Sequence, residues 1–484
     1  MARFSPLMAS LPLLISLMSA TFQAQANNQL PDIGTAGVAA LPIEQEVRYG
    51  NAFMRFARAG LPIIDDPVLS EYIDDLGQRL LTNADGVRFP FTFFLINDPS
   101  INAAAFLGGR VKVHTGLFLY ADNESELASV LAHEITHVTQ RHIARYMEAQ
   151  ASSSAMTLAG LVGSIALAVI NPTAGIAALQ TTLGLSMQSA INYTRDNEYE
   201  ADRIGMKTLY DAGFDPMGMA SFFQKLAAEY RYASKPPEML LTHPLPETRI
   251  SEARARANSY GRRALPPSLD FWLAKVRIQV RYGTETPQAL LTYFDSRLQK
   301  GDYPLKDAAI YGKALALLQL KRTDEADTLM QSLAARHPED LFVVDALTDI
   351  DLAKGRSAQA IARLERFRTR MPDNEVVVVN LGNAYLEAGN YKKSIAILDP
   401  YAREHDENSL AWSLLSDAYR KAGRMTDLHM ARAETLSLRG DYQAAIDELI
   451  VARGTTSDKL TLARIEARIT QLERAKKDLD SLKG

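Results

Sequence analysis

The chain has 484 residues, of which 47% are hydrophobic and 23% charged, which is typical of a soluble globular protein long enough for two domains. Its formal net charge of −4 offers no basic surface for nucleic acid, so no nucleic-acid partner is expected. The chain contains no cysteine, which excludes disulfides, thiolate metal ligands and cysteine nucleophiles. A bound metal must therefore be held by His and carboxylate side chains.

Residues 1–26 have the pattern of a secretory signal peptide. Arg3 supplies the positive charge, Met8 to Met18 is an apolar run, and Ala24-Gln25-Ala26 fits the small-x-small cleavage pattern, so the mature chain should begin at Asn27. The alternative is an N-terminal membrane anchor, but the apolar run is shorter than the roughly 20 residues that a bilayer span needs. A cleaved signal peptide predicts a secreted protein.

Between residue 27 and about residue 265 the sequence mixes strand and helix patterns. Aromatic and β-branched residues indicate one strand, and a Gly-Gly turn introduces a second. Cap residues and apolar periodicity indicate two helices, the second ended by Gly213. The predicted elements are strands at 88–97 and 108–114 and helices at 124–148 and 195–212. This half is expected to be α+β, with helices dominant.

The segment between these helices, residues 152–190, is small and apolar and is interrupted by Asn171-Pro172. Its 16-residue run from Ala155 to Ile170 is short for a membrane span. Two interpretations stay open: a buried helical hairpin, or a lid or surface that makes peripheral contact with membrane or unfolded protein.

The paired prolines in Ala264-Leu-Pro-Pro-Ser268 predict a boundary between domains 27–265 and 266–484. Beyond it the pattern is helical and repeats every 34 residues. The matching residues are Gly355, Gly389 and Gly423, Pro338 and Pro372, Ile361 and Ile395, Ala384 and Ala418, and Tyr385 and Tyr419. This period resembles tetratricopeptide repeats, which form an α-solenoid. A related motif at Arg439–Ile446 is out of phase by half a unit, so a distortion of the array is expected there.

The strongest chemical motif is His133-Glu134-Ile135-Thr136-His137. Residues four apart share one face of a helix, so both imidazoles can bind the same ion, and Glu134 can reach a water beside it. Zinc lowers the pKa of such a water to about 7, and a carboxylate can then remove its proton. The alternative is a pair of histidines that merely decorate a helix.

A third ligand must come from elsewhere, because no third His follows at the metzincin spacing. Glu198 and Asp202 are four apart, matching the His pair. We expect Glu198 to bind the ion and Asp202 to accept a hydrogen bond from a ligand imidazole. Taken alone, this stretch also fits a solvated acidic face balanced by Arg195 and Arg203. The upstream motif favours the metal interpretation, with one zinc per chain.

These residues resemble the gluzincin peptidases related to the CAAX prenyl endopeptidases and the bacterial heat-shock membrane protease. The resemblance covers about residues 45–255 and includes the Asn102-Ala103 and Gly108-Gly109 pairs that precede the zinc helix, although Leu107 stands where many members have Pro. The whole architecture is similar to the family of periplasmic proteases that assist outer-membrane β-barrel assembly in Gram-negative bacteria. That resemblance implies a periplasmic enzyme that promotes folding of outer-membrane β-barrels and degrades stalled ones. It also implies the barrel-assembly machinery and lipopolysaccharide-transport barrels as partners.

Two further residues follow the zinc helices in a segment similar to the family's His-Pro…Arg stretch. Arg249 is a candidate for stabilising the oxyanion of the reaction. His243, in a Pro-bounded loop, either takes the fourth zinc position and inhibits the enzyme or helps to bind substrate.

The sequence therefore predicts a mostly helical zincin-type peptidase followed by tetratricopeptide repeats, with Glu134 as general base and later proton donor. Substrate is expected to add as a strand beside Val111–His114. The alternative function is a repeat-based chaperone or scaffold with a largely latent protease site.

Overall fold

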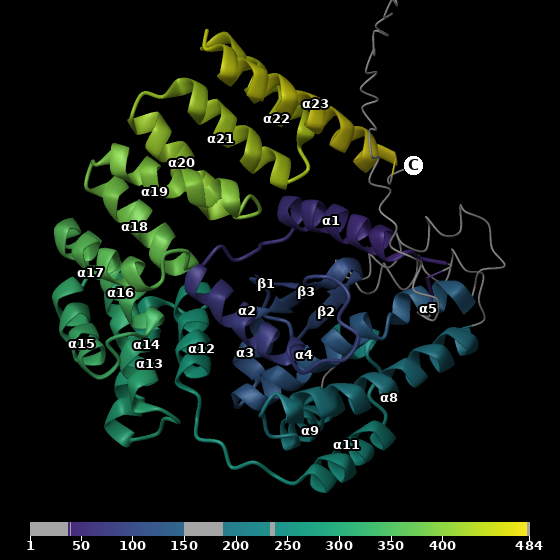
Figure 1. The fold of residues 1–484 in the computed structure, drawn as a ribbon. Coiled ribbons are helices and arrows are strands. Elements are labelled where there is room, and N and C mark those ends of the chain that lie inside the picture. The colour runs from purple at the N-terminus through teal and green to yellow at the C-terminus, as the bar shows by residue number, and fades with distance from the viewer. Residues whose placement is uncertain (1–36, 39, 150–186, 233–237, 482–484) are drawn as a thin grey trace, which may run out of the picture. The chain divides into compact units, whose positions relative to one another are not determined.

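The computed structural model describes residues 37–38, 40–149, 187–232 and 238–481 (Figure 1). The predicted signal peptide and nearly all of the 152–190 segment lie outside these residues. In the part of the chain that is described, no helix is both long and apolar enough to cross a membrane.

A three-stranded sheet forms the centre of the first half. Its strands are β1 (Thr92–Ile96), β2 (Ala103–Phe106) and β3 (Arg110–His114), in the order β1-β3-β2. β1 runs parallel to β3, and β2 runs antiparallel to it. Gly108 and Gly109, with φ of 70° and 72°, make the turn into β3, as the Gly-Gly motif predicts.

The prediction that substrate adds beside Val111–His114 is wrong, because β3 is the central strand. Both of its sides are already paired, by β1 and by β2. An added strand can pair only with an edge, so β2 and β1 are the candidates.

The helices of this half pack on the sheet and on one another, with α4 in contact with α2, α8, α9 and β2. They are α1 (Ile43–Gly60), α2 (Pro67–Leu81), α3 (Thr115–Tyr120), α4 (Glu124–Thr139), α5 (His142–Ala149), α8 (Met187–Asp211), α9 (Met217–Tyr232), α10 (Glu238–Thr242) and α11 (Glu247–Tyr260). The two predicted ligand helices, α4 and α8, therefore lie side by side (Figure 1).

The helix predicted at 124–148 is broken into α4 and α5, so that prediction is wrong in its continuity. Arg141 has a left-handed φ of 53°. Its buried guanidinium donates to the Glu46 carboxylate at 2.7 and 2.9 Å, and also to the Leu41 carbonyl. Such a backbone conformation is costly for a non-glycine residue and persists where the surroundings fix it. The helix predicted at 195–212 is longer than expected, since α8 begins at Met187, but it ends as predicted before Gly213, whose φ is 89°.

Beyond residue 268 the described chain is a succession of helix pairs. They are α12 (Leu269–Tyr282), α13 (Pro287–Lys300), α14 (Lys306–Gln319), α15 (Thr323–Arg336), α16 (Leu341–Ala353), α17 (Ser357–Arg370), α18 (Glu375–Glu387), α19 (Tyr391–Glu404), α20 (Ser409–Lys421), α21 (Met425–Leu438), α22 (Tyr442–Gly454) and α23 (Lys459–Ser481). Gly355, Gly389 and Gly423 each follow the first helix of a pair with φ near 70°, which confirms the 34-residue period. Gly440, with φ of 73°, instead follows the second helix α21, where the motif is out of phase.

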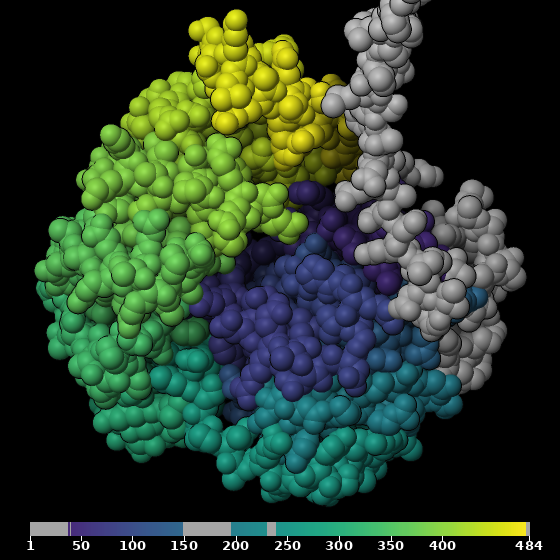
Figure 2. Space-filling view, in the orientation of Figure 1, coloured from purple at the N-terminus to yellow at the C-terminus, as the bar shows by residue number. Residues whose placement is uncertain are grey.

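The peptidase half and the repeats share one buried core within the compact unit Gly37–Gly484. A continuous apolar cluster runs from Ile64 to Val376 and crosses the proline-rich segment 264–268. The buried Arg277 of α12 donates to Asp66, at the start of α2, at 2.8 Å, and lies 2.7 Å from Asp345 of α16. Asn374, before α18, donates to Glu71 of α2 at 2.8 Å. Figure 2 shows the repeats, green to yellow, lying against the purple peptidase surface.

Candidate metal centre

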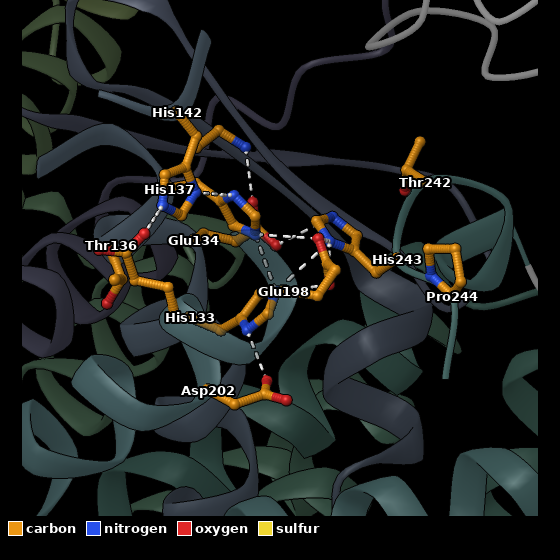
Figure 3. Close-up of polar contacts among 12 residues, drawn as sticks. His133, Glu134, Thr136, His137, His142, Glu198, Asp202, Thr242, His243 and Pro244 are labelled. Carbon is orange, nitrogen blue, oxygen red and sulfur yellow. Dashed lines mark hydrogen bonds and ion pairs between the residues drawn. The ribbon is translucent and has the colours of Figure 1, made fainter. Parts of the chain in front are cut away.

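Four side chains from three segments converge at the contact between α4 and α8. His133 and His137 come from α4, Glu198 from α8, and His243 from the loop after α10. One potential ligand atom from each lies within 4.8 Å of all the others. Figure 3 shows the three imidazoles and the Glu198 carboxylate turned toward one another. The structure thus brings together the three predicted metal ligands and the predicted fourth one.

Glu134 lies at the edge of this cluster. One carboxylate oxygen, Oε2, accepts the backbone N–H of Ala105 in β2 at 2.9 Å. The other, Oε1, is buried with no hydrogen-bond partner among the described residues and lies 3.4 Å from Nε2 of His243. A buried carboxylate oxygen with an unused acceptor position is suited to hold a water.

The spacing of α4 and α8 depends on Gly205. On α8, Glu198, Asp202 and Gly205 follow each other at four and three residues, so they share one face. A Cβ atom added at Gly205 would lie 3.0 Å from the carbonyl oxygen of Ala132 and 3.1 Å from the amide nitrogen of His133. The two helix backbones are therefore close because this position has no side chain.

Asp202 lies behind His133. Its Oδ1 is 3.0 Å from Nδ1 of His133, while Nε2 of His133 faces Glu198 at 3.3 Å. Asp202 also accepts two bonds from Arg249, at 2.7 and 2.8 Å. This arrangement fixes which imidazole nitrogen faces the cluster.

Arg249 points to these carboxylates and to the loop that carries His243. Besides Asp202, it lies 2.8 Å from Glu198 and donates to the carbonyl of Pro244 at 2.6 Å. All three contacts occupy a guanidinium that is almost wholly buried. This geometry favours a positioning role for Arg249 over the oxyanion role that the sequence suggests.

His142, the first residue of α5, also contacts a ligand imidazole. Its Nδ1 lies 2.8 Å from Nδ1 of His137, and its Nε2 lies 3.3 Å from Glu200 of α8. On a continuous helix, residues five apart point in directions that differ by roughly 140°. The break at Arg141 is what allows the two rings to meet, so helical spacing gave no signal for this pair.

The charges in the cluster show that it favours a cation. Burial would lower the pKa of His133, but Asp202 and Glu198 raise it to about 10. Burial would raise the pKa of Glu198, but His243, His137 and Arg249 lower it well below its usual value. Burial lowers the pKa of His137 to about 4, so this ring is neutral and its lone pair is available. Imidazole and carboxylate donors with an excess of buried acid fit a divalent ion such as zinc.

Comparison with known proteins gives the same picture. The model of peptidase family M48 matches residues 67–257, and two tetratricopeptide-repeat models match residues 308–340 and 351–418. A relative from Vibrio cholerae is 54% identical over 66% of each chain. Proteins named beta-barrel assembly-enhancing protease from Yersinia pestis and Escherichia coli K12 are 50% and 46% identical, over 70% and 71% of each chain.

The chain belongs to the β-barrel assembly-enhancing protease family. It is a metalloprotease of the M48 type with tetratricopeptide repeats, which confirms the predicted fold class and enzyme class. M48 peptidases depend on zinc, and the cluster described above lies within the residues that the M48 model matches.

Proposed function

We propose that this chain is a zinc endopeptidase in which His133, His137 and Glu198 hold one zinc ion. The observation that carries this proposal is the convergence of these ligand atoms beside the unused oxygen of Glu134. Zinc supplies a Lewis acid that polarises the scissile carbonyl and lowers the pKa of water. Glu134 takes the proton from the attacking water and later gives it to the leaving amine. Asp202 orients His133, and Arg249 holds Glu198, Asp202 and the His243 loop together.

Metal analysis of purified mature protein tests this assignment. About one zinc per chain is expected for a site with three protein ligands. His133→Ala, His137→Ala and Glu198→Ala should each lower the zinc content. Full proteolytic activity with zinc retained after Glu198→Ala would overturn the ligand set.

For the substrate we propose pairing with the edge strand β2. Ala105 of β2 donates its amide to Glu134, so this side of the strand faces the catalytic carboxylate. A peptide added there in extended form would be held through its backbone, which gives broad sequence tolerance. Ala105→Pro would remove the backbone donor that this edge presents to Glu134, and should raise KM for an unfolded substrate without loss of zinc.

We further propose a periplasmic role in assembly and quality control of outer-membrane β-barrels. The support is the name of the Yersinia and Escherichia relatives, beta-barrel assembly-enhancing protease, together with repeats of a kind that bind protein along extended surfaces. The expected partners are the barrel-assembly machinery and unfolded barrels, including those of lipopolysaccharide transport. The observation in favour of the alternative, a repeat-based chaperone with a largely latent protease site, is that His243 lies within the ligand cluster.

One variant separates these two functions. Glu134→Gln removes the general base but leaves the ligands and the repeats in place. Loss of every growth and barrel-assembly phenotype favours the enzyme, and retained support of barrel assembly favours the chaperone. Because the repeats and the peptidase share a core, the full chain is the right material for this comparison.

His243 we propose to be an inhibitory fourth ligand. Its Nδ1 lies 3.0 Å from Glu198 and 3.3 Å from Nε2 of His133, within the ligand cluster. In that position it excludes the water that Glu134 needs. His243→Ala should then raise turnover of a casein-like unfolded substrate at unchanged zinc content, whereas a role in substrate binding predicts a fall.

A further inference from the structure

We infer that His142 is a positioning residue for the metal ligand His137. Nδ1 of His142 accepts a hydrogen bond from the Nδ1–H of His137, which turns Nε2 of His137 toward the metal. This inference rests on the proposed zinc site and deepens it. His142 belongs to α5, outside the ligand motif on α4. Its ring stands nearly perpendicular to that of His137, with centroids 4.8 Å apart (Figure 3).

The hydrogen positions follow from the chemistry of imidazole. Nε2 of His137 faces Glu198 and His133, so this is the nitrogen available to a metal. A neutral imidazole that binds through Nε2 carries its one proton on Nδ1. Two nitrogens 2.8 Å apart share one proton, so His142 must present an unprotonated Nδ1 to His137. His142 is thereby fixed as the tautomer protonated on Nε2.

The second ring nitrogen of His142, Nε2, lies near a carboxylate. Glu200 Oε2 lies 3.3 Å from this nitrogen, and Arg145 of α5 donates to the same oxygen at 2.8 Å. Glu200 sits on α8, two residues after the ligand Glu198. The contacts among His137, His142, Glu200 and Arg145 therefore connect the second histidine of the motif to α5 and α8.

The two imidazoles of the zinc motif are thus oriented by different partners. His133 faces the charged Asp202, whereas His137 faces the ring of His142, whose Nε2 lies 3.3 Å from Glu200. Partners behind metal-binding histidines set ring orientation, and their loss commonly weakens metal binding by about 10- to 100-fold. His142 is buried against His137, so its effect on zinc is expected to pass through this ligand.

The first test needs only the zinc-loaded wild-type protein. Long-range ¹H–¹⁵N spectra of the imidazoles report which nitrogen of each of the eight histidines carries a proton. His142 should be protonated on Nε2 alone, and His137 on Nδ1. A His142 protonated on Nδ1 would overturn the inference. Absence of zinc from the wild-type protein would instead defeat the proposed function.

The second test measures zinc affinity by competition with a chelator in three full-length variants. His142→Phe roughly keeps the ring volume but cannot accept a hydrogen bond from His137. It should bind zinc about 10- to 100-fold more weakly. His142→Gln, whose amide can both accept and donate, should remain within about fivefold of wild type. Met147→Ala is the matched control, since Met147 lies on α5 in the apolar cluster with Leu41 and Phe53. It should leave zinc affinity unchanged.

Wild-type affinity in His142→Phe would overturn the inference. So would equal losses in all three variants, which would assign His142 a packing role only. If His142→Phe does not fold, the inference is still tested by two measurements. These are the zinc affinity of His142→Gln relative to Met147→Ala and the tautomer of His142 in the wild type. A loss in His142→Gln larger than in Met147→Ala, combined with an Nδ1-protonated His142 in the wild type, would count against the inference.

Discussion

The metal centre and the Arg277 cluster both bury carboxylates, but these carboxylates face different kinds of partner in the two places. Arg277 lies between Asp66 and Asp345, at 2.8 and 2.7 Å, and donates to the hydroxyl of Tyr311 at 3.0 Å. Around the metal centre, Glu134, Glu198 and Asp202 surround three imidazoles with Arg249 as their fixed cation. The carboxylates of the Arg277 cluster therefore face fixed guanidinium cations, whereas those of the metal centre also face imidazoles, which can bind an ion. Buried carboxylates that face imidazoles mark a functional site more clearly than burial of charge by itself.

The largest expected effect is the loss of catalysis in Glu134→Gln. Removing the general base should lower kcat on an unfolded protein substrate by about 10³-fold or more, which is about 4 kcal/mol in the barrier. Zinc content should stay at the wild-type level, because Glu134 is outside the ligand cluster. Turnover assays and metal analysis on the same preparation provide the check, and substantial residual turnover would place the base elsewhere.

Arg277→Leu should lower stability by about 3–5 kcal/mol, because it leaves Asp66 and Asp345 buried without their cation. Denaturant unfolding followed by circular dichroism measures this loss. Arg420→Leu, at a half-exposed pair with Asp417, is the control and should change stability by less than about 1 kcal/mol. Equal stability of the two variants would show that the Arg277 cluster contributes nothing to the free energy of unfolding.

Removal of zinc should affect stability through the metal centre and not through the Arg277 cluster. A chelator should lower the unfolding midpoint of wild-type protein, by the equivalent of about 2.7 kcal/mol for a metal previously held at 100 times its Kd. His133→Ala should show no such fall, since it has already lost the ion. Arg277→Leu should show the full fall, because its defect lies away from the ligands. A chelator effect that persists in His133→Ala would indicate a metal bound at another site.

The smallest expected effect concerns pH at the contact between the peptidase and the repeats. Burial of Glu375, together with the charges of Glu71, Asp65 and Asp74, raises its pKa from 4.5 to about 7. A carboxyl whose pKa is raised in the folded state stabilises the fold while it is protonated. This contribution is complete below about pH 4.5 and is lost as the pH rises through 7.

Glu375→Gln should therefore stabilise the protein at pH 8, by about 1–3 kcal/mol, and have little effect at pH 5. Thermal unfolding midpoints at both pH values measure the difference. Glu387→Gln, an exposed position on the same helix, should change neither. A Glu375→Gln midpoint that rises equally at both pH values would remove titration as its cause.

Regular spacing decided which parts could be predicted from the sequence. The ligands on α4 and α8 and the 34-residue repeat depend on contacts within one helix or one repeat, which periodicity reveals. The break at Arg141 could not be predicted, because its cause is a buried pair with Glu46, 95 residues away. The pairing of His137 with His142 follows from that break. The central place of β3 was missed for a related reason, since strand order is set by connections and not by the strand's own residues.

Gly205 has a consequence for anyone who sets out to make this protein more heat-resistant. Replacing a glycine inside a helix with alanine usually stabilises the helix by up to about 1 kcal/mol, so consensus and design schemes favour that exchange. Here the new methyl group would lie 3.0 Å from the Ala132 carbonyl oxygen, one residue from His133, so α4 and α8 would have to separate by a few tenths of an ångström. The substitution that strengthens the helix would thus shift Glu198 relative to the histidines. Selection for thermal stability at this position would therefore act against zinc affinity.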